Sequence, residues 1–564
     1  MKTLSKLLAA AMVIAWLAGP CATSAQQTVP IEAPRPDLKI SELPPGCGFI
    51  PPNIDLSHLA NIRHPQRSIA DTAPARWDWR SQGAVTAIRN QSVCGACYSF
   101  ASIASFESRL LIDGAGTYDF SENNAKECNW YQTSCGGGNF NEVASFFSQY
   151  GTVLETCDPY VASDVSCNSS CAYIKSLLDW RIISGDNVPD AATLKDYIYN
   201  YGPIYTSLYA GDGSVPSWQT EFNNYDGSYV LYYTGTETPN HAVCIVGYDD
   251  TLSHAGGQGA WIVKNSWGTS WGGTCGYGAE SGYFKIAYGS ASIGKWSSFV
   301  DGWQDYDATG EVLFYDEGGW TSSWGYGATT CWSLSKFTPS GSVYLRRVEL
   351  WTTDATTDID VYVYDDFDGS APSNLLTSEL NSSFGEAGYH SIRLTSPPLL
   401  SSGNAVYVVV QIVNSSGTSP IAADNQGGAE TATTYMSSNG AGGSWYDLGL
   451  NQGDDIGVRI RVSSTVGIDD DYTLNRPGSP IAIRNYPNPF NNRTTIEYSL
   501  PSDGHVVLQV FDILGRHVET LINGFQAAGN YQTDWDSRDL TSGYYFYKIQ
   551  SGSSVQTGQM LLLK

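Results

Sequence analysis

Short runs of alternating apolar and polar residues recur between residues 301 and 464, and clusters of turn residues separate them. The runs at 358–364 and 405–410 are examples, and 366–370 is one of the turns. A period of two puts successive side chains on opposite faces of a strand, so that one face can be buried. This pattern restricts the segment to an all-β fold, and we predict a sandwich of roughly 160 residues.

The length of 564 residues predicts roughly four folding units, at about 150 residues per domain. Aromatic residues make up 13% of the chain, which excludes a disordered protein, because disordered chains contain few aromatics. The 30 basic residues are outnumbered by 56 acidic ones, and the net charge is −26. Such a chain does not neutralise phosphates, so we predict no nucleic-acid partner.

The N-terminus has the features of a secretory signal. Lys2 and Lys6 precede an apolar run from 7 to 17, and small residues end at Ala25. We predict a cleaved signal peptide at residues 1–25, with a signal anchor or a lipid anchor at Cys21 as alternatives. No later stretch holds 18 consecutive apolar residues, so no transmembrane helix is predicted. Export makes disulfide bonds permissible.

Residues 26–73 contain prolines too close together for a long helix. We interpret this segment as an extended leader or pro-segment, and we place the start of a folded core at residue 74. The leader carries one cysteine, Cys47, within the sequence Pro-Pro-Gly-Cys-Gly.

The segment 91–100 holds the first residues that suggest chemistry. After Cys97, apolar residues follow at helical spacing up to Leu110, and Asp113 and the glycine after it close the predicted helix. Cys97 therefore lies at a helix N-terminus, where free N–H groups and the helix dipole stabilise a thiolate nucleophile. The same residues also fit a redox pair of Cys94 and Cys97, half of a zinc site, or a simple disulfide.

Two strand-like segments carry the next candidates. His241 opens an apolar run that extends to residue 248, and Asn265 ends another run that begins at residue 261. Two strands joined by a loop can place a histidine and an asparagine side by side at one end of a sheet. His254, the other histidine between residues 74 and 300, is interpreted as a solvated loop residue.

Residues 94–98, Cys-Gly-Ala-Cys-Tyr, satisfy the pattern C-G-[SA]-C-[WY] of the papain-like (C1 family) cysteine peptidases, which this region resembles. His241 follows Cys97 by 144 residues and Asn265 follows it by 168. The family spacing is about 130–150 residues, and we attribute the larger distance to Asn265 to a long loop at 249–259. The resemblance covers 74–300 and implies a two-lobed α+β peptidase domain.

The resemblance assigns a role to each matching residue. Cys97 attacks the scissile carbonyl and forms an acyl-enzyme thioester, His241 activates it as a thiolate–imidazolium pair, and Asn265 orients the imidazole. Gln91 and the Cys97 N–H form the oxyanion hole. No metal or cofactor is implied. The residues expected to bind substrate are Gly137, Gly138, Ser207, Ala242 and Trp267, with Trp267 also shielding the His241–Asn265 bond.

The resemblance also implies disulfides. Cys94 is expected to pair with Cys135, which leaves Cys97 free, and Cys128 is expected to pair with Cys167 or Cys171. The partners within the group Cys157, Cys167 and Cys171 stay open. Cys244, in an apolar run, is interpreted as a buried free thiol.

The long helical pro-segment of the family has no counterpart in residues 26–73. Latency must therefore work differently or be absent. One hypothesis is that Cys47, the unpaired leader cysteine, caps Cys97 as a mixed disulfide.

The region 301–464 resembles, at residues 319–327, the lectin-like domain that follows some bacterial papain-like peptidases. Its tryptophans are interpreted either as sugar-stacking residues or as core residues; they are Trp320, Trp324, Trp332 and Trp351.

The acidic turn at 365–368 is interpreted either as a Ca²⁺ site or as a solvated turn; its acidic residues are Asp365, Asp366 and Asp368.

A polar linker is predicted at 465–480, and residues 481–564 are predicted to form a small Ig-like β-sandwich. Its motifs at 486–490, 510–516, 543–549 and 560–564 resemble the C-terminal sorting domain of type IX secretion. That resemblance implies the secretion machinery as a partner. An ordinary adhesive Ig-like module is the alternative.

Together these features predict a monomeric cysteine endopeptidase, secreted and then extracellular or cell-surface, with protein or peptide substrates. Glycans are a further expected partner of residues 301–464. The alternative is a surface adhesin that binds glycans and whose papain-like fold is inactive or ligase-like.

Overall fold

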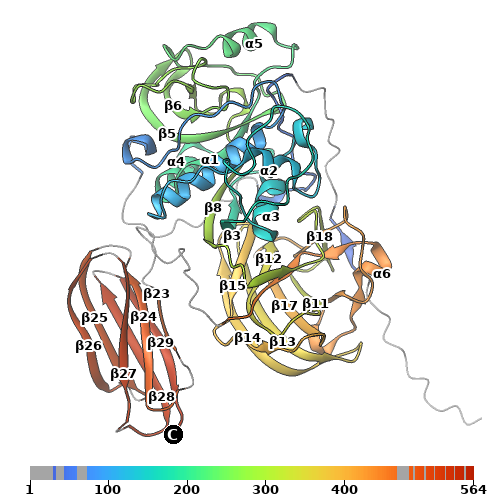
Figure 1. Cartoon of the computed structure of the whole chain (residues 1–564), viewed down its shortest axis with the longest axis vertical. Coiled ribbons are helices and arrows are strands. Elements are labelled where there is room, and N and C mark those ends of the chain that lie inside the picture. The colour runs from blue at the N-terminus through green and yellow to red at the C-terminus, as the bar shows by residue number, and fades with distance from the viewer. Residues whose placement is uncertain are drawn as a thin grey trace, which may run out of the picture.

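The computed structural model describes residues 29–33, 44–59, 73–465, 482–486, 490–500, 503–513, 515–527, 529–538, 540–551 and 554–564. The predicted signal peptide and nearly all of the predicted linker lie outside the described residues. A mixed helical and β unit is followed by a β-sandwich and by a smaller β unit (Figure 1). In the described part of the chain, no helix is long and apolar enough to cross a membrane.

The first unit has two lobes. Helices α1, α2 and α3 pack against one another on one side, and the other lobe is a sheet that packs against α4 and α5. Neighbouring strands of this sheet, from β7 through β6, β5 and β4 to β8, are antiparallel. The helices are α1 (Cys97–Ile112), α2 (Glu122–Glu127), α3 (Phe140–Gln149), α4 (Ala191–Tyr201) and α5 (Pro216–Asn223). The strands are β2 (Arg76–Asp78), β3 (Lys175–Ile182), β4 (Ile204–Leu208), β5 (His241–His254), β6 (Gly257–Lys264), β7 (Tyr283–Ala287) and β8 (Lys295–Asp305).

Helix α1 forms where the spacing of apolar residues predicts it. Phe100, Ile103, Phe106 and Leu110 are all buried, and the N–H of Asp113 closes the helix on the carbonyl of Arg109. The region 249–259 differs from the prediction, because most of it is strand. It forms the tip of the β5–β6 hairpin, with a register shift between Asp249 and Ser253. Backbone pairing continues there to His254 and Gly257. The residues that give Asn265 its larger separation from Cys97 therefore lengthen two strands and do not form a long loop. His254 lies at this tip, partly exposed, beside Tyr232.

The second unit is the predicted β-sandwich. One of its sheets, which we call the outer sheet, has the strand order β14-β13-β17-β11-β19-β20. Its inward side chains meet those of β12, β15 and β22 in an apolar core. The elements are β9 (Gly310–Leu313), β10 (Ser322–Gly325), β11 (Thr330–Phe337), β12 (Val343–Thr352), β13 (Thr357–Phe367), β14 (Pro372–Phe384), β15 (Gly388–Arg393), β16 (Leu399–Leu400), β17 (Val406–Asn414), β18 (Ile421–Asp424), β19 (Thr434–Ser437), β20 (Tyr446–Asp447), α6 (Leu448–Gln452), β21 (Asp455–Ile456) and β22 (Val458–Ser463).

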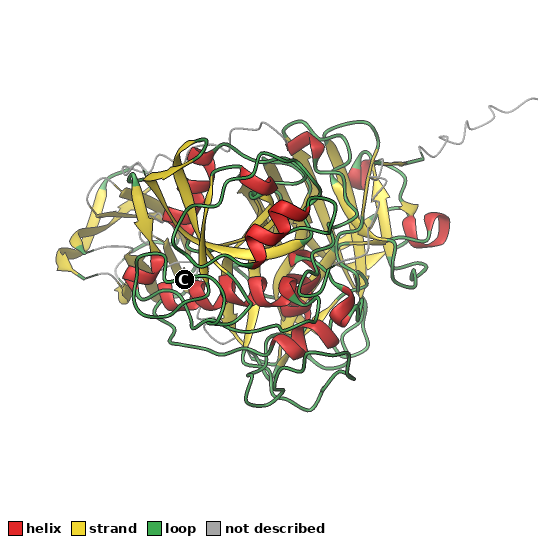
Figure 2. Cartoon of the chain, turned by 90° about the horizontal axis from the view of Figure 1, so that it is seen from above, coloured by secondary structure: helices red, strands yellow, loops and turns green. Residues whose placement is uncertain are grey.

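One antiparallel sheet runs through both units in the order β7-β6-β5-β4-β8-β3-β15-β12-β22-β9. The junction is the pairing of β3 with β15, where Tyr389 faces Trp180. Trp180 is fully buried, and its ring centroid lies 4.8 Å from that of Trp351 in an edge-to-face arrangement. Seen from above, strands extend through the molecule with helices lying against them (Figure 2). The sandwich and the first unit therefore share a core, in which β3 of the first unit packs against β15 and Trp351 of the sandwich.

A buried ion pair adds to this junction. Arg459 on β22 donates to the carboxylate of Asp316 at 2.8 Å and to the hydroxyl of Ser145 on α3 at 2.9 Å. Both charged side chains are fully buried, so each depends on the other to offset its desolvation.

Three of the four tryptophans considered for sugar stacking are core residues. Trp320, Trp324 and Trp351 are at most 5% exposed, and the indole N–H of each donates to a neighbouring side chain. Packing is therefore the correct reading for these three, whereas Trp332 is partly exposed. The Asp368 carboxylate accepts hydrogen bonds from the backbone of Ser370 and the residue after it, so it stabilises its own turn. Within the described ranges, no group of three potential metal ligands is present.

The third unit is a two-sheet sandwich with strand orders β23-β24-β27 and β26-β25-β28-β29. Trp535 lies fully buried in its core, and Phe490 is bridged to Leu562 near the C-terminus. Its strands are β23 (Ala482–Tyr486), β24 (Arg493–Leu500), β25 (Gly504–Asp512), β26 (His517–Gln526), β27 (Gly529–Asp536), β28 (Gly543–Ser551) and β29 (Ser554–Leu562).

The described parts of the leader contact both of the larger units. Strand β1 (Ile31–Glu32) pairs antiparallel with β10 of the sandwich. Residues 44–59 cross the first unit, and the ring Nε2 of His58 lies 2.6 Å from the carbonyl of Thr353 in the sandwich. The leader thus contacts the sandwich at β1 and again at His58. Between these two contacts it packs against the first unit.

Candidate active site

Cys97 is the first residue of α1, and its side chain is fully buried. Its Sγ accepts a hydrogen bond from the backbone N–H of Ala242 at 3.3 Å, and the nearby backbone N–H of Gly48 also favours negative charge there. The first N–H groups of a helix have no partner within the helix, so the N-terminus of α1 favours negative charge at this position. The sulfur is thus surrounded by N–H donors from three segments of the chain.

His241 and Asn265 are brought together by the pairing of β5 with β6. Cys244 faces Lys264 across the two strands, so the first residue of β5 lies next to the residue after β6. His241 Nε2 is 2.8 Å from the side-chain oxygen of Asn265, which can only accept. The proton of a neutral His241 is therefore on Nε2, and its Nδ1 carries a lone pair.

Nδ1 of His241 is buried and has no hydrogen-bond partner among the described residues. The next residue, Ala242, is the one whose N–H contacts the Cys97 sulfur. The unpartnered Nδ1 therefore belongs to the residue next to one that contacts the Cys97 sulfur. The ring centroid of Trp267 lies 5.0 Å from that of His241, so the indole covers the imidazole.

Gln91 is also completely buried, and its amide group is fixed at both ends. Its Nε2 donates to the carbonyl of Cys94 at 2.8 Å, and its Oε1 accepts from the hydroxyl of Ser266 at 2.5 Å. An amide nitrogen carries two hydrogens, so one N–H stays available. Gln91 is therefore held in a fixed orientation, bonded to the carbonyl of Cys94 just before α1.

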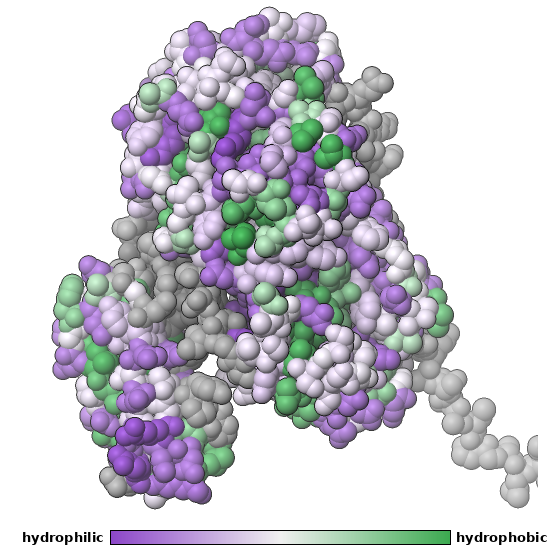
Figure 3. Space-filling view, in the orientation of Figure 1, coloured by the Kyte–Doolittle hydropathy of each residue, from purple (hydrophilic) through white to green (hydrophobic). Residues whose placement is uncertain are grey.

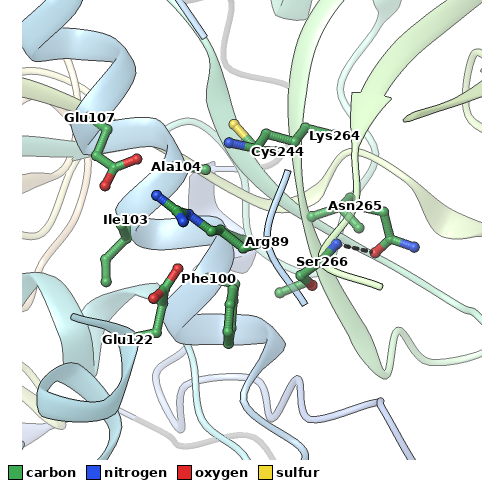
Figure 4. Close-up of a pocket in the computed structure, with 13 residues that line it drawn as sticks. Arg89, Phe100, Ile103, Ala104, Glu107, Glu122, Cys244, Lys264, Asn265 and Ser266 are labelled. Atoms are coloured by element: carbon green, nitrogen blue, oxygen red, sulfur yellow. Dashed lines mark hydrogen bonds between the residues drawn. The ribbon is translucent and has the colours of Figure 1, made fainter. Parts of the chain in front are cut away.

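Behind these residues lies a buried polar cluster that the sequence analysis missed (Figure 4). Lys264, directly before Asn265, donates to the backbone carbonyl and hydroxyl of Thr86, and that hydroxyl donates to Glu107 on α1. Glu107 also accepts the N–H of Phe120. A cavity of about 20 Å³ lies among these side chains, which is room for about one water molecule.

The cluster ties the end of β6 to the helix that carries Cys97. Arg89 points toward Glu107 and Glu122 in Figure 4 and forms an ion pair with Asp119. Burial raises the pKa of Glu107, and burial lowers the pKa of Lys264, although each charge partly offsets this for the other. Acidic residues within the apolar spacing of α1, and a lysine ending a buried strand, are the signals that could have revealed it.

Leader residues 44–50 occupy the groove above this site. Gly138 donates to the carbonyl of Gly48 at 2.9 Å and accepts from the N–H of Ile50 at 3.0 Å, so the leader runs parallel to the glycine-rich edge. The indole N–H of Trp267 donates to the carbonyl of Gly46 on the other side. A side chain on Gly137, whose φ is +104°, would collide with Gly48. Gly137, Gly138 and Trp267 therefore contact an extended peptide, as a substrate-binding role requires.

The other two expected pocket residues lie deeper. Ser207 faces Ala242 across the β4–β5 pair, both are fully buried, and the Ser207 hydroxyl donates to the carbonyl of Lys295. Phe49 of the leader is 1% exposed, and its backbone N–H donates to the carbonyl of Asn240, two residues before Ala242. The apolar pocket around it is lined by Phe140, Tyr205 and Trp296, residues that were not predicted.

Burial also affects the charge state of the site. It raises the pKa of Cys97 to about 12 and lowers the pKa of His241 to about 4. Beneath the leader, both groups are therefore neutral at pH 7. The thiolate–imidazolium pair expected from the sequence therefore requires the groove to open to water.

Acidification is expected to weaken leader binding. Exposure returns the pKa of His241 toward its ordinary value of 6.5, so the open state binds more protons between pH 6.5 and about 4. The binding contribution of neutral His241 is complete above pH 6.5 and is lost as the pH falls toward 4, by up to about tenfold per pH unit. Calorimetry of a synthetic 44–59 peptide with leader-free protein between pH 4.5 and 8 measures this. An affinity independent of pH across that range would contradict it.

The disulfides leave Cys97 free. They join Cys94 to Cys135, Cys128 to Cys167 and Cys157 to Cys171. The first is the pair implied by the resemblance, and the second is one of the two alternatives expected for Cys128. The third pairs the remaining two cysteines of the group whose connectivity was left open. Among the described residues, the free cysteines are Cys47, Cys97, Cys244, Cys275 and Cys331.

Three family models match this chain in succession. Residues 73–299 match the papain family cysteine protease model, 312–459 the lectin like domain and 484–563 the secretion system C-terminal sorting domain. Cysteine proteinase 1 of Entamoeba histolytica is 33% identical over 224 residues, 38% of this chain and 64% of that protein. Cathepsin O of Homo sapiens is 30% identical over 227 residues, 39% and 63% of the two chains. The chain covers less than two thirds of the length of these relatives.

Among solved structures, the crystal structure of the cysteine protease and lectin-like domains of Cwp84, a surface layer associated protein of Clostridium difficile, is similar in fold. The TM-score is 0.58 at 18% identity, and the match covers 70% of this chain and 89% of that one. The predicted fold class, a two-lobed α+β domain followed by β-sandwich units, is confirmed.

Proposed function

We propose that this chain, which carries a papain-family cysteine protease domain, a lectin-like domain and a secretion sorting domain in that order, is a secreted cysteine endopeptidase. The observation that carries the proposal is the arrangement of three side chains. Cys97 lies at the N-terminus of α1, and His241 has its Nε2 bonded to Asn265 and its Nδ1 unpartnered within the described structure. This arrangement supplies a nucleophile, a base and a residue that orients the base.

The reaction follows from these positions. His241 Nδ1 takes the thiol proton as Cys97 Sγ bonds to the substrate carbonyl carbon, and the resulting oxyanion accepts hydrogen bonds from Gln91 Nε2 and the Cys97 N–H. The imidazolium then donates its proton to the leaving amine as the C–N bond breaks, which leaves a thioester. A water molecule that gives its proton to His241 hydrolyses the thioester and restores the thiol.

In this proposal the described structure is the latent precursor. The leader fills the groove with an extended backbone that pairs with Gly138, and a substrate takes its place after release. The proposed segments are a signal peptide at 1–25, a leader at 26–73, the peptidase at 74–300, the lectin-like sandwich at 301–464, a linker at 465–480 and the sorting domain at 481–564. The sorting domain supports export through type IX secretion to the cell surface or the medium.

The test is cleavage of a peptide library by reduced, leader-free protein, with products identified by mass spectrometry. We expect internal cleavage of many peptides, and loss of cleavage in His241→Ala although its Cys97 can still be alkylated. The absence of cleavage in the wild type would overturn the proposal and favour an inactive adhesin. Joined peptides among the products would instead indicate a ligase.

A second function, glycan binding, is supported by the outer sheet. Partly exposed aromatic rings from β11, β13, β17 and β19 lie on one face of it. The rings of Trp332 and Tyr362 are nearly parallel at 6.1 Å, and those of Tyr362 and Tyr364 are nearly parallel at 6.5 Å. Flat rings in a row with phenol hydroxyls can stack on successive sugar rings of a neutral polysaccharide. The face also includes Tyr407 and Tyr435.

Truncating one of these rings is expected to weaken polysaccharide binding. In a titration with neutral polysaccharides, Trp332→Ala and Tyr362→Ala should each lower affinity by up to about tenfold, because each removes one stacking contact. Tyr544→Ala, an exposed tyrosine on β28, is the matched control and should have no effect. Equal binding by all three variants, or no binding by the wild type, would assign these rings to packing alone.

A further inference from the structure

Cys47 of the leader and Cys97 of α1 are two free, buried thiols in neighbouring segments of the chain. Cys47 is 4% exposed and Cys97 is fully buried. The backbone of Cys47 and Gly48 packs against Gly95, and a Cβ on Gly95 would lie 2.9 Å from the Cys47 carbonyl oxygen. Gly95 is two residues before Cys97, so Cys47 lies beside the segment that carries the Cys97 thiol. A disulfide requires the two Cα atoms to lie about 4.4–6.8 Å apart, a separation that neighbouring segments can reach.

The backbone on both sides of Cys47 is held in register. Gly46 donates to the carbonyl of Val93 and accepts from Trp267, and Phe49 donates to the carbonyl of Asn240. A Cβ on Gly48 would overlap the carbonyl oxygen of Gly95, so only glycine fits there. The segment cannot slide by one residue, because a residue with a side chain would then enter that position. These contacts therefore fix the position of Cys47 relative to the segment that carries Cys97.

Burial of the pair keeps both sulfurs protonated. Desolvation raises the pKa of Cys47 well above its ordinary value, and the proximity of Cys97 raises it further. A charge on either sulfur would be unfavourable beneath the leader, whereas a disulfide carries none. The other free cysteines in the described ranges lie on β5, on β11 and in the loop at 275, away from the leader.

We propose that Cys47 and Cys97 form a disulfide bond that locks the leader over the groove, so that the precursor stays latent until a thiol reduces it. This inference rests on the proposed function, because the locked residue is the proposed nucleophile. It goes beyond that function by adding a covalent modification site on the leader.

The reaction requires an exchange partner, a low-molecular-weight disulfide. When the leader opens transiently and exposes Cys47 to water, its thiolate attacks the small disulfide, a mixed disulfide forms and one thiolate leaves. The thiolate of Cys97 then attacks the Cys47 sulfur, and the second thiolate leaves. Two protein thiols are oxidised, and one small disulfide is reduced to two thiols. Reversal by excess low-molecular-weight thiol restores free Cys47 and Cys97, and the leader is then held by its noncovalent contacts alone.

The test is peptide mapping of the full-length precursor, treated with oxidised glutathione and digested without reduction. We expect a linked pair of peptides that contain Cys47 and Cys97, in addition to the three disulfides of the first unit. Cys275→Ser, which removes a partly exposed thiol elsewhere, should leave the linked pair unchanged. A free Cys47, or Cys47 joined to another cysteine, in the oxidised wild type overturns the proposal.

Peptide hydrolysis by the same samples separates this proposal from the proposed function. Oxidised wild-type precursor should be inactive and should regain hydrolysis on reduction, whereas Cys47→Ser should hydrolyse equally with and without reductant. A linked pair in the map without any hydrolysis after reduction would sustain the lock and reject the peptidase. Full hydrolysis by the oxidised precursor would reject the lock and sustain the peptidase.

Discussion

Replacing Cys97 by alanine is expected to abolish peptide hydrolysis, with a fall in kcat of about 10⁵–10⁶. The sulfur is the atom that would bond to the substrate carbonyl, and His241 and Gln91 act only through it. Activity of leader-free variant and wild type on one peptide substrate, under reducing conditions, measures the effect.

Two controls make the Cys97 result specific. Cys244→Ala removes another buried thiol of the same unit, on β5, and should keep hydrolysis near the wild-type level. An unchanged melting temperature of Cys97→Ala would show that the variant is folded. Hydrolysis by a folded Cys97→Ala variant at more than about one hundredth of the wild-type rate would exclude Cys97 as the nucleophile.

Replacing Gln91 by alanine is expected to lower kcat by about 10²–10³ with a small effect on KM. The amide N–H would bond to an oxygen that is negatively charged only in the transition state, so its loss affects the reaction more than substrate binding. Steady-state kinetics on one peptide substrate separates kcat from KM.

Ser266→Ala is the companion to Gln91→Ala. The Ser266 hydroxyl donates to Gln91 Oε1, so its removal loosens the amide without deleting the N–H donor. We expect a smaller fall in kcat, about tenfold. Equal losses in the two variants would mean that Gln91 supports the structure of the site and does not contact the oxyanion.

The sequence predicted the parts of the site that depend on local pattern. Helical spacing after Cys97 placed it at the start of α1, and strand-like runs placed His241 and Asn265 on neighbouring strands. These predictions succeed because a helix start and a strand end follow from nearby residues. The disulfide partners of Cys157 and Cys171 needed the structure, because spacing does not choose between connectivities.

The parts that the sequence did not predict depend on contacts between distant segments. The pairing of β3 with β15 joins residues about 200 positions apart and makes one sheet of two units. The Glu107–Lys264 cluster likewise unites a helix and a strand through Thr86. The course of the leader also escaped prediction, since its path through the groove is set by Gly48 and its neighbours and not by any helical pattern.

The surface indicates less about function than the residues of the groove do. The face in Figure 3 shows apolar residues in small separate groups among hydrophilic ones. The residues with candidate chemistry, Cys97, His241, Asn265 and Gln91, are instead buried beneath the leader.

Titration of reduced, leader-free protein with a thiol-reactive epoxide, with hydrolysis and labelling followed together, tests whether Cys97 is the nucleophile. Hydrolysis should fall in proportion to labelling and end when one label per molecule is attached, and peptide mapping should find the label on Cys97. Hydrolysis that persists after Cys97 is fully labelled, or inactivation by a label on another residue, would contradict that assignment.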